Sequence, residues 1–230
     1  DVELCVKHKV PAVITSLGAR PEVNDAIHSY GGITLHDVIN NSFAKKAIEK
    51  GADGLIAVAA GAGGHAGGLS PFALVQEIRQ WFDGPLILSG AIANGKSILA
   101  AQAMGADLAY IGSPFIATEE ANAIDSYKQM IIECGAEDII YSDYFTGVWG
   151  NYLKPSLVAN GLDPDNLQDS SGVKMNFGEG ESDKTKKWKN IWGSGQGIGT
   201  IKDIVAAADR ISDLKAQYEA AKDCLKAAYG

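Results

Sequence analysis

Positive charge, cysteine and long apolar runs are all scarce in this chain, and each shortage excludes a class of protein. Of its 230 residues, 20 are Lys or Arg and 28 are Asp or Glu, which gives a formal net charge of −8. A nucleic-acid-binding surface needs clustered positive charge, so nucleic acid is not an expected partner. No apolar stretch approaches the ~18 residues of a membrane-spanning helix and no signal peptide is visible, so no membrane association is expected.

Cysteine occurs three times, at positions far apart and without the C-x-x-C spacing of a metal or redox site: Cys5, Cys134 and Cys224. Such isolated thiols are typical of reduced intracellular proteins, so we expect a cytoplasmic location and no metal. The chain also begins at Asp1 without a methionine, and the residues from Val2 to Val6 resemble the end of a helix. We therefore expect the chain to start in the middle of a domain.

Short β-branched runs alternate with helical patterns along the first 135 residues. The pattern predicts strands at 11–18, 31–38, 53–60, 85–92 and 107–115, and helices at 42–51, 70–82, 96–105 and 118–134. Strands that are apolar on both faces and are each followed by a helix form parallel sheets covered by helices. The segments 49–61 and 102–114 also repeat the order helix, Gly-Ala-Asp, strand, Gly. We predict an α/β fold, a TIM (β/α)8 barrel of which about five C-terminal βα units are visible here.

Three parts are predicted along the chain. Residues 1–138 form the C-terminal part of the barrel, and residues 139–200 form an insertion on the substrate side. Within that insertion we expect a helix near 155–160 and an exposed polar loop at 169–190. Residues 201–230 carry an amphipathic helix, at 201–228, that packs on the barrel.

Glycine is abundant, with 27 residues, and its most concentrated run is GAGGHAGG at 61–68. A P-loop requires a lysine after its last glycine, and this run has none. The dinucleotide pattern G-x-G-x-x-A is satisfied by Gly61, Gly63 and Ala66. That motif must open a helix, however, and here Ser70 and Pro71 mark a later helix start. A dinucleotide-binding site is therefore the weaker interpretation.

His65 is the one reactive side chain in the glycine run. In a barrel, a loop after a strand lies at the C-terminal face, where barrel enzymes have their active sites. Gly63 and Gly64 would let the backbone approach a flat ring, and a neutral histidine carries protons near pH 7. A histidine that only fills a turn would not need glycines on both sides. We interpret His65 as a functional residue.

The next two predicted strands end in glycine and serine. Ser89, Gly90 and Ala91 follow one strand, and Gly112 and Ser113 follow the next. Backbone N–H groups freed by glycine, with a serine hydroxyl nearby, form an anion nest that needs no lysine. Each pair alone is equally well explained as an ordinary turn, but two successive pairs favour a phosphate site.

Four segments together resemble the nitronate monooxygenases, also called 2-nitropropane dioxygenases. They are GADGLIAVAAGAGGHAGG, PLILSGAIANG, GADLAYIGSPFIATEEA and IWGSGQGIG, and the resemblance extends from about residue 11 to 205. It implies a TIM barrel that binds FMN and oxidises alkyl nitronates or nitroalkanes with O2 to a carbonyl compound and nitrite. A small-molecule substrate and O2 are then the expected partners, and a homodimer is left open as the assembly.

The resemblance also implies roles for single residues. His65 would face the flavin and act on the substrate as the catalytic residue. The cofactor-binding residues would be Gly63, Gly64, Ser89, Gly90, Ala91, Gly112, Ser113, Asp37 and Gln196. Many members carry a lysine after the fifth strand, where this chain has His36 and Asp37. His36 is therefore a second candidate for contact with the substrate.

Two alternative functions stay open at this point. Flavin-dependent enoyl-acyl-carrier-protein reductases have a similar Gly-Gly-His loop and use NADH or NADPH. A non-catalytic module that binds a nicotinamide dinucleotide through G-x-G-x-x-A belongs to a different class of protein.

Overall fold

The computed structural model describes residues 1–167 and 190–229, which form two compact units. The first unit contains residues 1–60, 67–89 and 100–110. The second contains residues 61–66, 90–99 and the described part of 111–230. All but residue 190 of the polar loop expected at 169–190 lies outside the described residues. The division into three parts at 138 and 200 stays a prediction.

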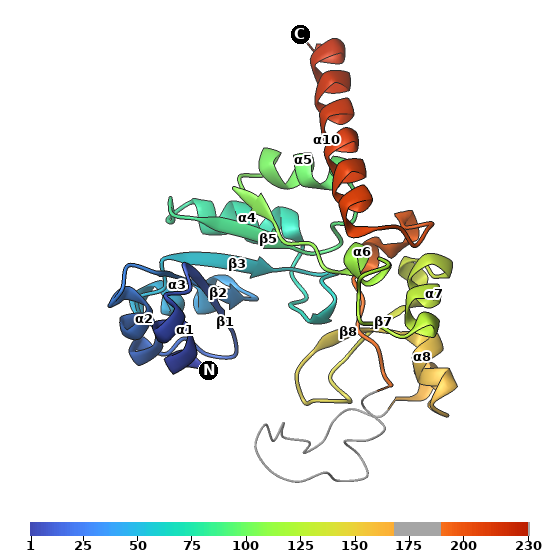
Figure 1. The fold of residues 1–230 in the computed structure, drawn as a ribbon, viewed down its shortest axis with the longest axis horizontal. Helices are drawn as coiled ribbons and strands as arrows, with labels where there is room; N and C mark the ends of the chain where they lie inside the picture. The colour runs from blue at the N-terminus through green and yellow to red at the C-terminus, as the bar shows by residue number, and fades with distance from the viewer. Residues whose placement is uncertain (168–189, 230) are drawn as a thin grey trace. The chain divides into compact units, whose positions relative to one another are not determined.

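A parallel sheet of five strands forms the centre of the first unit (Figure 1). Its order is β1-β2-β3-β5-β6, with strands Ala12–Thr15, Ile33–Val38, Gly54–Val58, Leu86–Ser89 and Leu108–Ala109. Strands that are successive in the parallel series are also neighbours in space, as in the consecutive βα units of a barrel. This is the α/β arrangement that the sequence predicts.

Helices connect the successive parallel strands. They are α2 Pro21–His28, α3 Asn41–Glu49, α4 Pro71–Arg79 and α5 Gly95–Ala103, the last of which is shared between the two units, and α1 Val2–His8 precedes β1. Helix α3 begins where the Asn40 side chain accepts the N–H of Phe43 over 2.9 Å. Helix α4 begins at Pro71, and Ser70 occupies its N-cap position without a side-chain capping bond. Helix α2 is not indicated by the sequence pattern, because its inward face is short and only Asn24 and Ile27 are buried.

The core of the first unit lies between the sheet and its helices. The buried side chains come from the strands (Leu55, Ala57, Leu86, Leu88) and from α3 and α4 (Ala44, Ala47, Leu74, Val75, Ile78). Full burial of one large aliphatic side chain contributes about 1.5–3 kcal/mol relative to exposure. Ile56 and Val58, which point to the other face of β3, are buried as well, so the continuous apolar run of this strand is explained by burial on both faces.

The repeated Gly-Ala-Asp motif has a structural role in each copy. Asp53 Oδ2 accepts the backbone N–H of Thr34 over 2.7 Å, and Asp107 Oδ2 accepts that of Leu86 over 2.8 Å. Each aspartate thus joins the start of one strand to the start of the preceding strand in the sheet. Burial raises the pKa of Asp107, but the bonds from Leu86 and Arg79 outweigh it and leave this pKa below its ordinary value.

The second unit contains a small antiparallel sheet in the order β4-β8-β7, with strands Gly64–His65, Gly150–Leu153 and Ile139–Ser142. Its α-helices are α6 Ser113–Ile116, α7 Asp125–Glu133, α8 Lys154–Ala159 and α10 Ala207–Tyr229. Short 3-10 helices lie at η1 Ala136–Asp138, η2 Pro164–Asn166 and η3 Gln196–Thr200. The predicted helix near 155–160 corresponds to α8.

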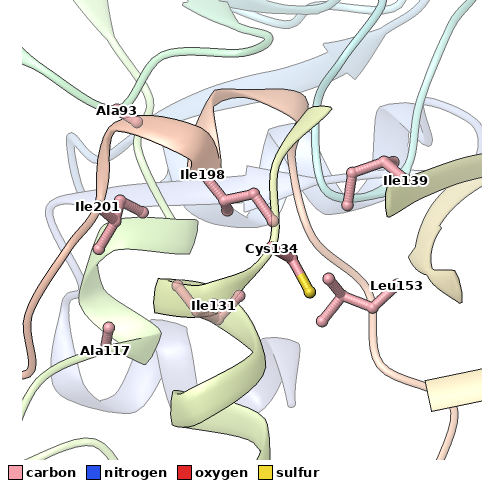
Figure 2. Packing of buried hydrophobic residues seen from close by; sticks show 8 residues of the cluster. All are labelled: Ala93, Ala117, Ile131, Cys134, Ile139, Leu153, Ile198 and Ile201. Carbon is pink, nitrogen blue, oxygen red and sulfur yellow. The ribbon is translucent and has the colours of Figure 1, made fainter. Parts of the chain in front are cut away.

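An apolar cluster holds the elements of the second unit together (Figure 2). It contains Ala93, Ala117, Ile131, Cys134, Ile139, Leu153, Ile198 and Ile201. These residues come from α7, β7, β8, η3 and the residues that end α7 and η3, together with Ala93 before α5 and Ala117 at the end of α6. Residues 193–201, which run into η3, are therefore anchored by Ile198 and Ile201, which are 0% and 1% exposed.

Two sequence predictions about this region were wrong. The strand expected at 107–115 ends at Ala109, and Ser113 and Pro114 instead begin α6, where a proline without an N–H is tolerated. The helix expected at 118–134 begins only at Asp125. Thr118 forms an isolated parallel bridge with Val205, and the Lys128 ammonium binds the carbonyl of Thr118 over 2.7 Å. These tertiary contacts hold the preceding residues in an extended path.

Candidate functional site

The glycine run does not start a helix but forms the edge of the antiparallel sheet. Gly64 lies opposite Asn151 and His65 lies opposite Gly150. The Asn151 side chain also donates to the carbonyl of Ala62 over 2.7 Å. The next helix begins at Pro71. A dinucleotide motif has to open a helix at this point, so the structure argues against that interpretation.

Close backbone packing explains several of the glycines at this site. A Cβ on Gly63 would lie 2.7 Å from the backbone nitrogen of Gly195, and one on Gly150 would lie 2.9 Å from the carbonyl oxygen of Gly64. A Cβ on Gly193 would lie 3.1 Å from the nitrogen of Gly64. The loop therefore fits between β8 and residues 193–195 only without side chains.

Gly64 differs from Gly63 in what surrounds it. Its φ is +71°, and among the described residues no atom outside its two chain neighbours lies within 4 Å of the position that a Cβ would take. At Gly64 the backbone is open on this side, and the expected contact with a flat ring stays a prediction. At Gly63 the available space is filled by Ser194 and Gly195.

His65 is held by a threonine that is far away in the sequence. Its Nε2 lies 3.0 Å from Oγ1 of Thr146, a residue that is only 3% exposed. The histidine itself is half-buried, and this burial lowers the pKa of its imidazole below the ordinary value of 6.5. The ring is therefore neutral at pH 7 and can accept a proton.

The predicted cofactor-binding segments of the second unit are joined by hydrogen bonds. The carbonyl of Gly61 accepts the N–H of Ala91 over 3.0 Å and the N–H of Gln196 over 2.9 Å. Oγ of Ser113 accepts the N–H of Gly195 over 2.9 Å. Four segments that are far apart in sequence, around residues 61–66, 90–91, 112–113 and 195–196, therefore meet in one place.

Not every predicted anion contact is available in this arrangement. The N–H of Ala91 is already bonded to Gly61. Within the described part of the chain, the N–H groups of Gly90 and Gly112 have no acceptor. The N–H of Ser113 lies in the first turn of α6, where the helix itself offers no acceptor. Three backbone donors and the open side of Gly64 therefore suit a phosphate-bearing planar cofactor. The contacts themselves stay predictions.

His36, Asp37 and Ser89 belong to the first unit, and their position relative to His65 stays a prediction. His36 is 4% exposed, and its Nδ1 lies 2.6 Å from Oγ1 of Thr15 on the neighbouring strand. Burial, and secondarily the charge of Lys50, lower the pKa of this histidine. A buried and partnered ring argues for packing rather than for the predicted contact with a substrate.

Asp37 lies on the same strand as His36 but, unlike that ring, is not fully hydrogen-bonded within the described residues. Its Oδ1 is buried, yet it has no hydrogen-bond partner within the described residues. Burial raises the pKa of this carboxyl, although a hydrogen bond with the Ser16 side chain lowers it. A buried acceptor without a partner is costly, and a donor on a ligand would satisfy it.

Sequence reasoning missed Thr146 and Asn151, which position the loop. The two residues lie 81 and 89 positions from their partners in the loop, and neither is part of a motif. No cluster of three or more metal-ligating side chains occurs among the described residues. No helix within the same part of the chain is long and apolar enough to cross a membrane.

Comparison with known proteins identifies the family of this chain. A family model described as nitronate monooxygenase matches residues 1–217. The chain belongs to the nitronate monooxygenase family. Members of this family are flavin-dependent oxidoreductases. The resemblance found in the glycine run and the three segments after it is thereby confirmed.

Two curated relatives illustrate the range of the nitronate monooxygenase family. A nitronate monooxygenase of Neurospora crassa is 25% identical over 231 residues, covering 91% of this chain and 59% of the relative. A carboxyl-CoA dehydrogenase of Rhodococcus jostii, named for its hydroxy-methyl-oxo-octahydroindene substrate, is 24% identical over 94% of this chain and 62% of the relative. The chain thus spans about three fifths of the length of these relatives.

A solved structure with a similar fold is that of a nitroalkane oxidase from Streptomyces ansochromogenes. It matches 97% of this chain and 68% of its own with a TM-score of 0.79, at 24% sequence identity. At this identity the likeness shows the fold alone. It confirms the predicted α/β class, with a run of βα units from a barrel.

Proposed function

We propose that this protein oxidises alkyl nitronates or nitroalkanes with O2 to a carbonyl compound and nitrite, with FMN as its cofactor. The observation that carries the proposal is the placement of His65. A neutral imidazole is held by a buried threonine, in a loop that packs against the backbone of β8 and residues 193–195 and leaves Gly64 open on one side. Membership of the family supplies the reaction class.

His65 supplies the proton chemistry in this proposal. The carbon that bears a nitro group is acidic because the nitro group stabilises the resulting anion. The neutral ring takes this proton, which forms the nitronate and a charged imidazolium. When the substrate is already a nitronate, His65 instead orients the nitro group. A neutral base with a pKa below 6.5 stays available over the whole physiological pH range.

The backbone donors described above would hold the cofactor. The N–H groups of Gly90, Gly112 and Ser113 suit the phosphate of FMN, and Gly64 leaves room beside the ring. Gln196, Ser89 and Asp37 are the further predicted contacts, of which Asp37 has an unsatisfied oxygen. When bound, FMN supplies the electron-accepting chemistry that no side chain of this site can provide.

The substitution His65→Asn tests the proposal. Asparagine keeps a polar side chain but cannot act as a base near pH 7. We expect the purified variant to stay yellow and to lose at least about 100-fold in nitrite release from neutral nitroalkanes. The matched control is His8→Asn, an exposed histidine on α1 of the first unit, which should leave both properties unchanged.

Each of the other possible outcomes of this experiment supports a different conclusion. Unchanged nitrite release in His65→Asn would overturn the assignment of His65. Rapid bleaching of the flavin by NADH or NADPH would favour the enoyl-reductase alternative. A colourless protein would overturn the flavin proposal and favour the nicotinamide-binding module. The cytoplasmic location and the homodimer stay predictions that these measurements do not address.

A further inference from the structure

The hydroxyl group of Thr146 has a single proton, and its surroundings determine where that proton lies. Oγ1 donates to the carbonyl of Val148 over 3.0 Å and accepts the N–H of Val148 over 3.2 Å. These two bonds close a tight turn between β7 and β8. With this proton directed toward the Val148 carbonyl, the oxygen accepts from His65.

We propose that Thr146 fixes neutral His65 with its proton on Nε2, so that Nδ1 is the nitrogen that acts on the substrate. A neutral imidazole carries one proton and exposes one lone pair, so the partner of one nitrogen determines the role of the other. The contact of 3.0 Å between Nε2 and Oγ1 therefore selects the tautomer as well as the ring orientation. Thr146 is a positioning residue in this scheme.

The surroundings of Thr146 make this selection rigid. The residue is 3% exposed, and His65 is held in register opposite Gly150 on β8. Tyr152, which is 4% exposed, is a further polar neighbour of Thr146, and its ring meets that of Phe145 edge to face at 4.8 Å. This burial and the strand register keep Thr146 and His65 in contact.

The tautomer can be measured by NMR without substrate. The chain contains four histidines, so 15N-labelled histidine gives a small set of ring signals, and the signals lost in His65→Asn identify His65. At a pH where the ring is neutral, we expect a protonated Nε2 and an unprotonated Nδ1. A ring protonated on Nδ1 instead would overturn the proposal.

Two substitutions separate the hydroxyl group from the bulk of the side chain. Thr146→Val keeps the shape and removes the hydroxyl, so we expect His65 to become a mixture of tautomers and nitrite release to fall at least about tenfold. Thr146→Ser keeps the hydroxyl and should restore the Nε2–H signal and most of the rate. The signals of the other three histidines serve as the control for folding.

The NMR test of the His65 tautomer does not depend on the proposed function. Only the catalytic role of Nδ1 rests on that function. If the wild-type protein releases no nitrite from nitroalkanes, the proposed function fails, while the tautomer assignment still stands or falls by NMR. If Thr146→Val leaves both the His65 signals and the rate unchanged, the inference about Thr146 is wrong even though the enzyme is active.

Discussion

Oγ of Ser113 accepts the N–H of Gly195 over 2.9 Å, although 82 positions separate the two residues in the chain. The bond joins the start of α6 to the buried backbone before η3. It also means that the serine predicted to bind phosphate has a structural task, because without it a buried N–H would lose its acceptor.

Replacement of Ser113 by alanine should therefore lower stability as well as flavin retention. We expect Ser113→Ala to lose about 1–2 kcal/mol in the free energy of unfolding, measured with urea, because the N–H of Gly195 is left unpaired. Ser212→Ala on α10 is the control, since its exposed hydroxyl only bonds back to Ala208 within the helix. Equal stability of the two variants would show that the bond to Gly195 contributes nothing.

The pH dependence of turnover should reveal the depressed pKa of His65. Burial disfavours the charged ring, so the neutral base persists to a lower pH than in an exposed histidine. We expect kcat/KM for a neutral nitroalkane to rise with pH, to pass an inflection below 6.5 and to stay level above it. With a preformed nitronate this step is not needed, and the same inflection should be absent. An inflection above 6.5 would contradict the assignment.

Gly63 should not tolerate even a methyl group. In Gly63→Ala the new Cβ would lie 2.7 Å from the nitrogen of Gly195. The atoms that it would meet, in Ser194 and Gly195, belong to the backbone and cannot rotate away as a flexible side chain can. We expect a loss of about 1–3 kcal/mol in the free energy of unfolding. Gly135→Ala is the matched control, because within 4 Å of its Cβ position the described part of the chain has no atom beyond the two chain neighbours, and its φ is not positive. Similar thermal melting of both variants would refute the packing argument.

Ala91 has a strained backbone, which a glycine should relieve. Its φ is +52°, in the left-handed region that L side chains rarely adopt. We expect Ala91→Gly to raise the free energy of unfolding by about 1 kcal/mol, since the bond from its N–H to Gly61 is kept. The same substitution at exposed Ala73 inside α4 should lower stability by about 1 kcal/mol. The opposite signs make calorimetry of the pair a direct test.

The parallel strands were predictable because each is a short apolar run with its own boundaries. The prediction failed where a local pattern competes with distant contacts. The expected strand through Pro114 and the expected helix from Thr118 both follow local propensity, and both are altered by the packing of α6 and the bridge to Val205. The missed helix α2 buries too few side chains to show a clear period.

His65 is predicted from sequence as the functional residue because glycine on both sides of a single reactive side chain is informative within a few residues. The sequence alone therefore determined the α/β class, the family and the histidine on which the proposed chemistry depends. It could not identify Thr146 or explain Gly63. The partner of His65 is 81 residues away, and the atoms that exclude a Cβ at Gly63 belong to Ser194 and Gly195. Only the tertiary structure decides such contacts, because hydrogen bonds and steric exclusion depend on distance in space and not on separation along the chain.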